Sequence, residues 1–179
     1  MELQPPDPPL SDGVVTLREW ALDDARDVTV ACRDPEIVRW TSEIPEDYTE
    51  EHARSWIAST ADGWAKGAAE LAITEARTGA LAGAIGLFVR EPWIAEIGYW
   101  TAARFRGRGL ATRALSLIAD WAAGLGFVRL QLLVLPGNEA SARVAAKAGF
   151  HEEGLLRSYA KQRGAITDVV VWSRVSARG

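Results

Sequence analysis

The sequence predicts a single mixed α/β domain. Its 179 residues are enough for one domain with a substantial core, and its 48% apolar and 25% charged residues are ordinary globular values. The hydrophobic periodicity changes along the chain from helical to alternating and back again. The resulting element order is β, α, α, β, β, β, α, β, α, β, β, without an internal repeat or a linker to a second domain.

Local signals place the elements of the first third of the chain. Asp23 and Asp24 lie near the start of the first helix, and Thr49 can cap the second. The predicted elements are a proline-rich extended arm (1–12) before the domain (13–179), a strand (13–20), a helix (22–34), a loop or broken helix (34–49) and a helix (49–67).

The rest of the chain alternates strands with two helices. Arg77-Thr78-Gly79 predicts a hairpin turn, and Asn138 and Gly149 are typical first and last residues of a helix. The predicted elements are strands at 69–76, 80–89 and 93–100, a helix from Leu110 to Leu125, a strand at 127–135, a helix at 138–150, and strands near 151–159 and 167–175.

Composition excludes several function classes. A net charge of −4 and a pI near 5.3 argue against nucleic-acid binding. No apolar run reaches a membrane-spanning length, and the N-terminus lacks the pattern of a signal peptide. The lone Cys32 excludes an intrachain disulfide, so we expect a cytoplasmic protein. His52 and His151 have no partner at metal-ligand spacing, so we expect no metal.

The stretch "ARFRGRGLATRAL" (102–114) stands out because it gathers four arginines in an acidic chain. Two glycines there precede a helix, and unpaired N–H groups at a helix N-terminus attract anions. The alternative is a solvated basic turn. The stretch lacks the Gly-x4-Gly-Lys-Ser/Thr of a P-loop and the third glycine of a dinucleotide fingerprint, so it predicts a different anion.

Arg104-Phe-Arg-Gly107-Arg-Gly109 resembles the Arg/Gln-x-x-Gly-x-Gly/Ala signature of the GNAT superfamily of N-acetyltransferases. The likeness extends through "AEIGYW" before it and "LLVLPGNEASARVAAKAGFHEEG" after it, and is similar to the branch with ribosomal-protein N-terminal acetyltransferases. It covers the chain from Val14 onward. The resemblance implies a twisted, mostly antiparallel sheet of six to seven strands, splayed between the fourth and fifth, with about four helices.

The resemblance also implies acetyl-CoA as co-substrate. The pyrophosphate would lie at the glycine loop, and the pantetheine arm would bind the strand before it and the helix from Asn138. The residues implied in cofactor binding are Ile97, Gly98, Tyr99, Trp100, Arg104, Arg106, Gly107, Arg108, Gly109, Leu110, Ala111, Asn138 and Ser141. Relatives often carry a glutamate where Arg113 stands, so this helix is more basic than usual.

Acetyl transfer to an amine needs a base, donors to the oxyanion and a proton for the thiolate. The resemblance implies Glu96 as the base, against a charged residue on a solvated strand, and a backbone N–H near Tyr99 as the oxyanion donor. Relatives often have a tyrosine where Ala145 stands, so Ser141, water or Tyr159 would protonate the thiolate. Capping alone would explain Asn138.

The acceptor is expected to be a small-molecule amine or a protein N-terminus. The loop before the second helix is acidic, which would attract a cation, and contains Glu43, Glu46, Asp47, Glu50 and Glu51. Trp40, Glu96 and Trp100 are the candidate substrate-binding residues. The alternatives are a longer acyl donor such as succinyl-CoA, or a non-catalytic CoA-binding module. We expect no nucleic-acid or membrane partner, and a homodimer is compatible with the sequence.

Overall fold

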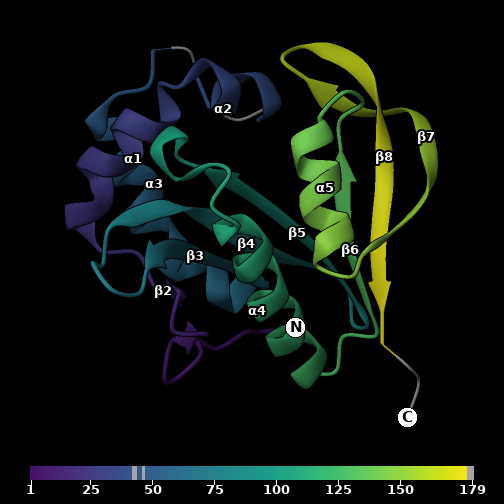
Figure 1. Cartoon of the computed structure of the whole chain (residues 1–179), viewed down its shortest axis with the longest axis horizontal. Helices are drawn as coiled ribbons and strands as arrows, with labels where there is room; N and C mark the ends of the chain where they lie inside the picture. The colour runs from purple at the N-terminus through teal and green to yellow at the C-terminus, as the bar shows by residue number, and fades with distance from the viewer. Residues whose placement is uncertain (42–43, 46, 177–179) are drawn as a thin grey trace.

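One eight-stranded sheet with helices on both faces organises the fold of the computed structural model, which describes residues 1–41, 44–45 and 47–176 (Figure 1). The strands are β1 (Leu10–Ser11), β2 (Val15–Arg18), β3 (Ala68–Glu75), β4 (Leu81–Glu91), β5 (Ile94–Thr101), β6 (Arg129–Val134), β7 (His151–Gln162) and β8 (Ala165–Val175). The α-helices are α1 (Ala25–Cys32), α2 (Pro35–Trp40), α3 (Glu50–Gly63), α4 (Leu110–Gly124) and α5 (Glu139–Lys147). Short 3₁₀ turns precede α1, follow α3 and follow β5.

The strand order is β1-β2-β3-β4-β5-β6-β8-β7, and every neighbouring pair is antiparallel except β5 and β6. The prediction of a mixed α/β domain with a mostly antiparallel sheet is confirmed. The sheet has eight strands rather than six or seven because Leu10–Ser11 of the N-terminal arm pairs with β2. The predicted loop or broken helix before the second long helix contains the short helix α2, which Asp34 caps by accepting from the Glu36 N–H.

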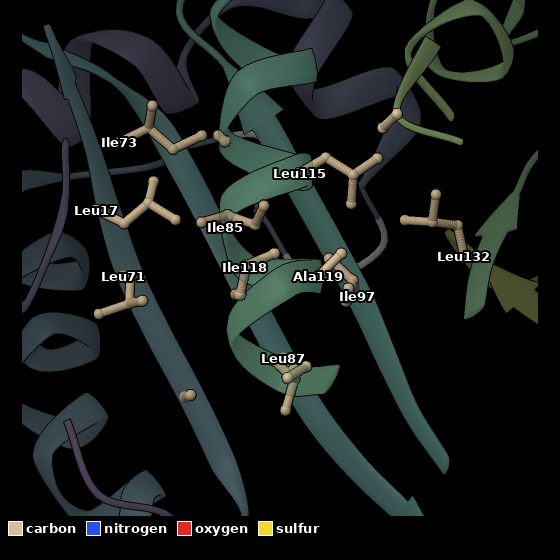
Figure 2. Close-up of a cluster of buried hydrophobic side chains, with 14 of the residues drawn as sticks. Leu17, Leu71, Ile73, Ile85, Leu87, Ile97, Leu115, Ile118, Ala119 and Leu132 are labelled. Atoms are coloured by element: carbon tan, nitrogen blue, oxygen red, sulfur yellow. The ribbon is translucent and has the colours of Figure 1, made fainter. Parts of the chain in front are cut away.

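Buried side chains divide into two layers, one on each face of the sheet. The α4 face is covered by α4 and α5, and Figure 2 shows α4, with Leu115 and Ile118, in front of the strands that carry Ile85 and Ile97. On the α3 face, α1 and α3 pack with Ala72 of β3. Because side chains alternate along a strand, consecutive residues of β5 point to different faces of the sheet. Functional side chains on β5 can therefore lie on either face.

The N-terminal arm lies against the domain. Leu3 is only 3% exposed, and its N–H donates to the Trp64 carbonyl at 2.9 Å. Asp12 accepts hydrogen bonds from the N–H groups of Val14 and Val15, each at 2.9 Å. Asp12 also pairs with Arg113, so the end of the arm lies beside the first turn of α4.

Candidate active site

The sheet opens between β5 and β6. Their parallel ladder contains only the pairs Ile94↔Arg129, Ala95↔Leu130 and Glu96↔Gln131, although β5 continues to Thr101 and β6 to Val134. β5 and β6 are the fourth and fifth of the strands predicted from the sequence, so the predicted splay between them is present. Beyond Glu96, the β6-facing backbone groups of β5 have no strand partner among the residues that the structure describes. Ile97, Gly98, Tyr99 and Trp100, predicted to bind the pantetheine arm, form this stretch, and every second one of them directs its N–H and C=O toward the opening.

The glycine loop lies at the N-terminus of α4. Gly107 and Gly109 have φ values of +71° and +77°, which L side chains rarely adopt, and a Cβ built on either would meet nothing within 4 Å. Among the described residues, none accepts a hydrogen bond from the N–H groups of residues 107–112. A cradle of free N–H groups at a 15-residue helix is a site for an anion, and it fits the pyrophosphate of coenzyme A.

The arginines of this stretch have carboxylate partners within the chain. The N···O distances are 3.6 Å for Arg104–Asp27, 2.8 Å for Arg106–Asp34, 2.5 Å for Arg108–Glu75 and 2.7 Å for Arg113–Asp12. Arg104, Arg106 and Arg108 were expected to supply charge to the phosphates, but their charge is already partly balanced. The backbone N–H groups, rather than the guanidinium groups, are therefore left free to bind an anion. Leu110 and Ala111, the first residues of α4, carry two of these N–H groups.

The pair Arg113–Asp12 accounts for the unusual arginine on α4. Asp12 lies at the end of the N-terminal arm, and Arg113 is in the first turn of the helix. The pKa of Asp12 is lowered, because hydrogen bonds from Arg113 and from the N–H groups of Val14 and Val15 outweigh its partial burial. A glutamate at position 113 would place two carboxylates side by side, so the arginine and the arm suit one another.

On the α4 face, β5 and α5 bring Tyr99 and Ser141 together. The Tyr99 Oη lies 2.9 Å from the Ser141 Oγ, and the Ser141 N–H donates to the Asn138 Oδ1 at 3.1 Å. Asn138 thus caps α5, as predicted. Burial raises the pKa of Tyr99 to about 12 against the opposing effect of its hydrogen bond with Ser141. The tyrosine is therefore neutral at physiological pH and can keep a proton in this hydrogen bond.

On the α3 face, Glu96 lies in a network that joins three strands. Arg90 of β4 donates from Nη2 to Oε1 at 2.9 Å and from Nε to Oε2 at 3.3 Å. Gln131 of β6 donates from Nε2 to Oε2 at 3.3 Å. The Glu96 side chain is 19% exposed, whereas that of Arg90 is 50% exposed. Glu96 is therefore held at the last paired position before the strands diverge.

A cavity of about 340 Å³ lies beside this network. Gln131 and Tyr159 are among its lining residues, and its apolar wall includes Leu133, Leu155 and Val171. Tyr159 is 56% exposed and lies within the irregular stretch of β7 between Leu156 and Ala160. Because Gln131 bonds Glu96, the cavity belongs to the α3 face. The structure thus places Tyr159 with Glu96 and on the face of the sheet opposite Ser141.

The two tryptophans predicted to bind the acceptor have different surroundings. Trp100 is half-buried on β5 and packs against both core layers. Trp40 ends α2, donates from Nε1 to Glu36 at 3.2 Å, and has its ring 4.0 Å from where a Cβ on Gly137 would lie. Trp40 therefore borders the loop before α5. Of the predicted acidic rim, Glu43 and Glu46 lie outside the described residues, and Glu50 pairs with Arg54 at 2.8 Å.

Three functional candidates were not predicted from the sequence: Arg90, Gln131 and the Tyr99 hydroxyl. Gln131 could have been found from the sequence, since a lone amide inside the apolar run "LQLLV" indicates a functional side chain. Arg90 at a strand end and Tyr99 in an apolar strand carried none. Across residues 1–41, 44–45 and 47–176, no group of three or more His, Cys, Asp or Glu side chains could hold a metal ion. In that same part of the chain, no helix is long and apolar enough to cross a membrane.

Comparison with known proteins shows the family and the fold. The acetyltransferase (GNAT) domain family matches residues 15–151. The chain is 30% identical over 164 residues to the uncharacterised N-acetyltransferase p20 of Bacillus licheniformis, covering 89% of this chain and 91% of that protein. The structure of Mycobacterium smegmatis RimJ in complex with CoA-disulfide superimposes with a TM-score of 0.81 at 27% identity, covering 94% of this chain and 86% of that one. RimL, a ribosomal L7/L12 α-N-protein acetyltransferase solved with coenzyme A, shares the fold with a TM-score of 0.81 at 22% identity, over 93% and 96% of the two chains.

Proposed function

The chain belongs to the GNAT family of acetyltransferases, and from that premise we propose that it acetylates a primary amine by direct transfer within a ternary complex. The observation that carries the proposal is the opening between β5 and β6. It has Glu96 on one face and the Tyr99–Ser141 pair on the other, so a base and a proton donor flank the same gap. Acetyl-CoA supplies the acyl group as an activated thioester.

The chain would hold coenzyme A at two places. The N–H groups at the start of α4, around Gly107 and Gly109, suit the pyrophosphate, and the unpaired backbone of β5 from Ile97 suits the pantetheine arm. A backbone N–H near Tyr99 would stabilise the oxyanion. These groups belong to the ordered sheet and helix, so little reorganisation is needed for binding.

The polar side chains around the opening would have different roles in the reaction. Glu96 accepts the proton of the acceptor ammonium, directly or through water, and leaves the nitrogen lone pair free. Ser141 donates from its Oγ toward the thiolate sulfur, and the neutral Tyr99 hydroxyl orients that donor. Asn138 fixes the backbone of Ser141. Tyr159 lines the acceptor cavity in this scheme, because it lies on the Glu96 face.

We propose that the acceptor is the α-amino group of a peptide or a similar small amine, because RimL acts on the N-terminus of a ribosomal protein. A panel of simple amines and peptides with free N-termini, incubated with acetyl-CoA and read by thiol release, tests this. Acetylation confirmed by mass spectrometry is expected for at least one member. Thiol release only with succinyl-CoA would show that acetyl-CoA is not the acyl donor. No thiol release with either thioester would contradict the proposed acetyltransferase activity.

Ser141→Ala is expected to lower kcat by about tenfold or more, on the scale of general acid catalysis, with little change in CoA affinity. Tyr99→Phe removes only the hydroxyl that contacts Ser141 Oγ and should give a smaller loss in the same direction. Steady-state kinetics and calorimetric titration with CoA measure the two effects. The matched control is Ser59→Ala, on the exposed surface of α3. Unchanged turnover in Ser141→Ala would remove the serine from the mechanism.

A further inference from the structure

The Arg90–Glu96 ion pair occupies the place where the proposed function requires the acceptor to approach. Arg90 comes from β4 and reaches across to both carboxylate oxygens of Glu96. A base that takes a proton from an ammonium ion must contact that ion or a water bound to it. In the structure, the cation in contact with Glu96 is instead the Arg90 guanidinium, which carries the same charge.

We propose that the Arg90 guanidinium is a stand-in for the acceptor, and that an incoming primary ammonium ion bearing an apolar group displaces it from Glu96. This inference rests on the proposed function, since it assigns the acceptor to the Glu96 face. Arg90 would then determine how tightly an acceptor binds, without taking part in the chemistry.

Exposure makes Arg90 the partner able to leave. Its side chain is 50% exposed near the end of β4, whereas Glu96 is 19% exposed and is also held by Gln131 from β6. Removing Arg90 therefore leaves Glu96 positioned by Gln131. A partly exposed ion pair contributes little stability, so an ammonium ion of equal charge can compete with it.

The cavity beside the pair indicates what else the acceptor carries. Gln131 and Tyr159 both line the cavity and both lie by the ion pair. Gln131 donates to Glu96. The pKa of the Arg90 guanidinium is raised, mainly by its hydrogen bond with Glu96 and also by the nearby Tyr159. The apolar side chains of Leu133, Leu155 and Val171 also line the cavity, and its charged residues Arg129 and Glu153 pair with each other. A cation beside an apolar wall suits an ammonium ion with a neighbouring hydrocarbon side chain, as at the N-terminus of a peptide that begins with an apolar residue.

Leucinamide and glycinamide are the probes that test this, because they share the ammonium and differ by an isobutyl group. Arg90→Met should lower the KM for leucinamide by about two- to fivefold with kcat unchanged, on the scale of a partly exposed ion pair. Leucinamide should also have a lower KM than glycinamide in both proteins. The matched control is Arg54→Met, which removes a similarly exposed arginine from its pair with Glu50 and should change neither constant.

A free guanidinium ion that binds where the Arg90 side chain was removed gives a second test of the proposal. Millimolar methylguanidinium should inhibit Arg90→Met competitively with leucinamide and should inhibit the wild type much less. A fall in kcat at constant KM, without such inhibition, would show that Arg90 positions Glu96 and would overturn the proposal.

Binding measured without turnover separates the inference from the proposed function. Ligand-observed NMR with leucinamide should show tighter binding to Arg90→Met and weaker binding to Glu96→Gln than to the wild type. That pattern without acetylation by any of the three proteins would overturn the proposed function and leave the inference standing. Equal binding to all three, or none, would overturn the inference even in an active enzyme.

Discussion

Glu96→Gln is expected to lower kcat/KM for the acceptor by about 10²- to 10⁴-fold, the usual contribution of a positioned general base. Glutamine is nearly isosteric with glutamate, and its one carbonyl oxygen can still accept from Arg90 Nε and from Gln131 at the Oε2 position, so the fold should survive. The amide cannot take a proton from the acceptor ammonium at neutral pH. The loss should shrink as pH rises, because more of the amine is then already deprotonated in solution.

Rates measured across a pH series, with CoA-induced thermal shifts for each protein, check this expectation. Glu91→Gln is the matched control, since Glu91 is exposed at the end of β4 and should give wild-type rates. Near-normal rates for Glu96→Gln at every pH would return Glu96 to a structural ion pair. Loss of the CoA-induced shift along with the activity would mean that the residue supports the fold.

Gly109→Asp is expected to abolish the thermal stabilisation that coenzyme A gives to the wild-type protein. A ligand at about 100-fold above its Kd stabilises by about 2.7 kcal/mol, or very roughly 5–10 °C for a chain of this size. The aspartate would fill the open space above Gly109 and place a negative charge beside the N–H groups that would bind the pyrophosphate. Activity should fall with the binding.

A control variant separates the backbone strain of replacing a glycine at positive φ from the effect of a negative charge at the anion site. Gly126 lies just beyond the other end of α4, has a φ of +95°, and also has open space where a Cβ would lie. Gly126→Asp should therefore have a similar backbone cost but keep the full CoA-induced shift in differential scanning fluorimetry. An undiminished shift in Gly109→Asp would place the cofactor elsewhere on the molecule.

Patterns within a few residues predicted most elements, but they gave the margin of one helix face wrongly. The apolar residues at helical spacing that predict the buried face of α4 are Leu110, Ala114, Leu117, Ile118, Trp121 and Leu125. Leu110, Ala114 and Ile118 are buried as predicted, but Leu125 is 44% exposed, and Leu115, which is not in the pattern, is completely buried. Periodicity gives the width of an apolar stripe only roughly, and the sheet beneath the helix decides which residues at its margin are covered.

The sequence by itself determined the order of the elements, the capping of α3 and α5 by Thr49 and Asn138, and the glycine loop before α4. Each depends on backbone preferences and hydrogen bonds between residues a few positions apart. The tertiary structure alone decided the partners: Asp12 for Arg113, 101 residues away, and Ser141 for Tyr99, 42 residues away. It also set Glu96 between Arg90 and Gln131. These contacts depend on strand register and on where β5 and β6 diverge, which follow from the packing of the whole sheet and leave no local periodicity to detect.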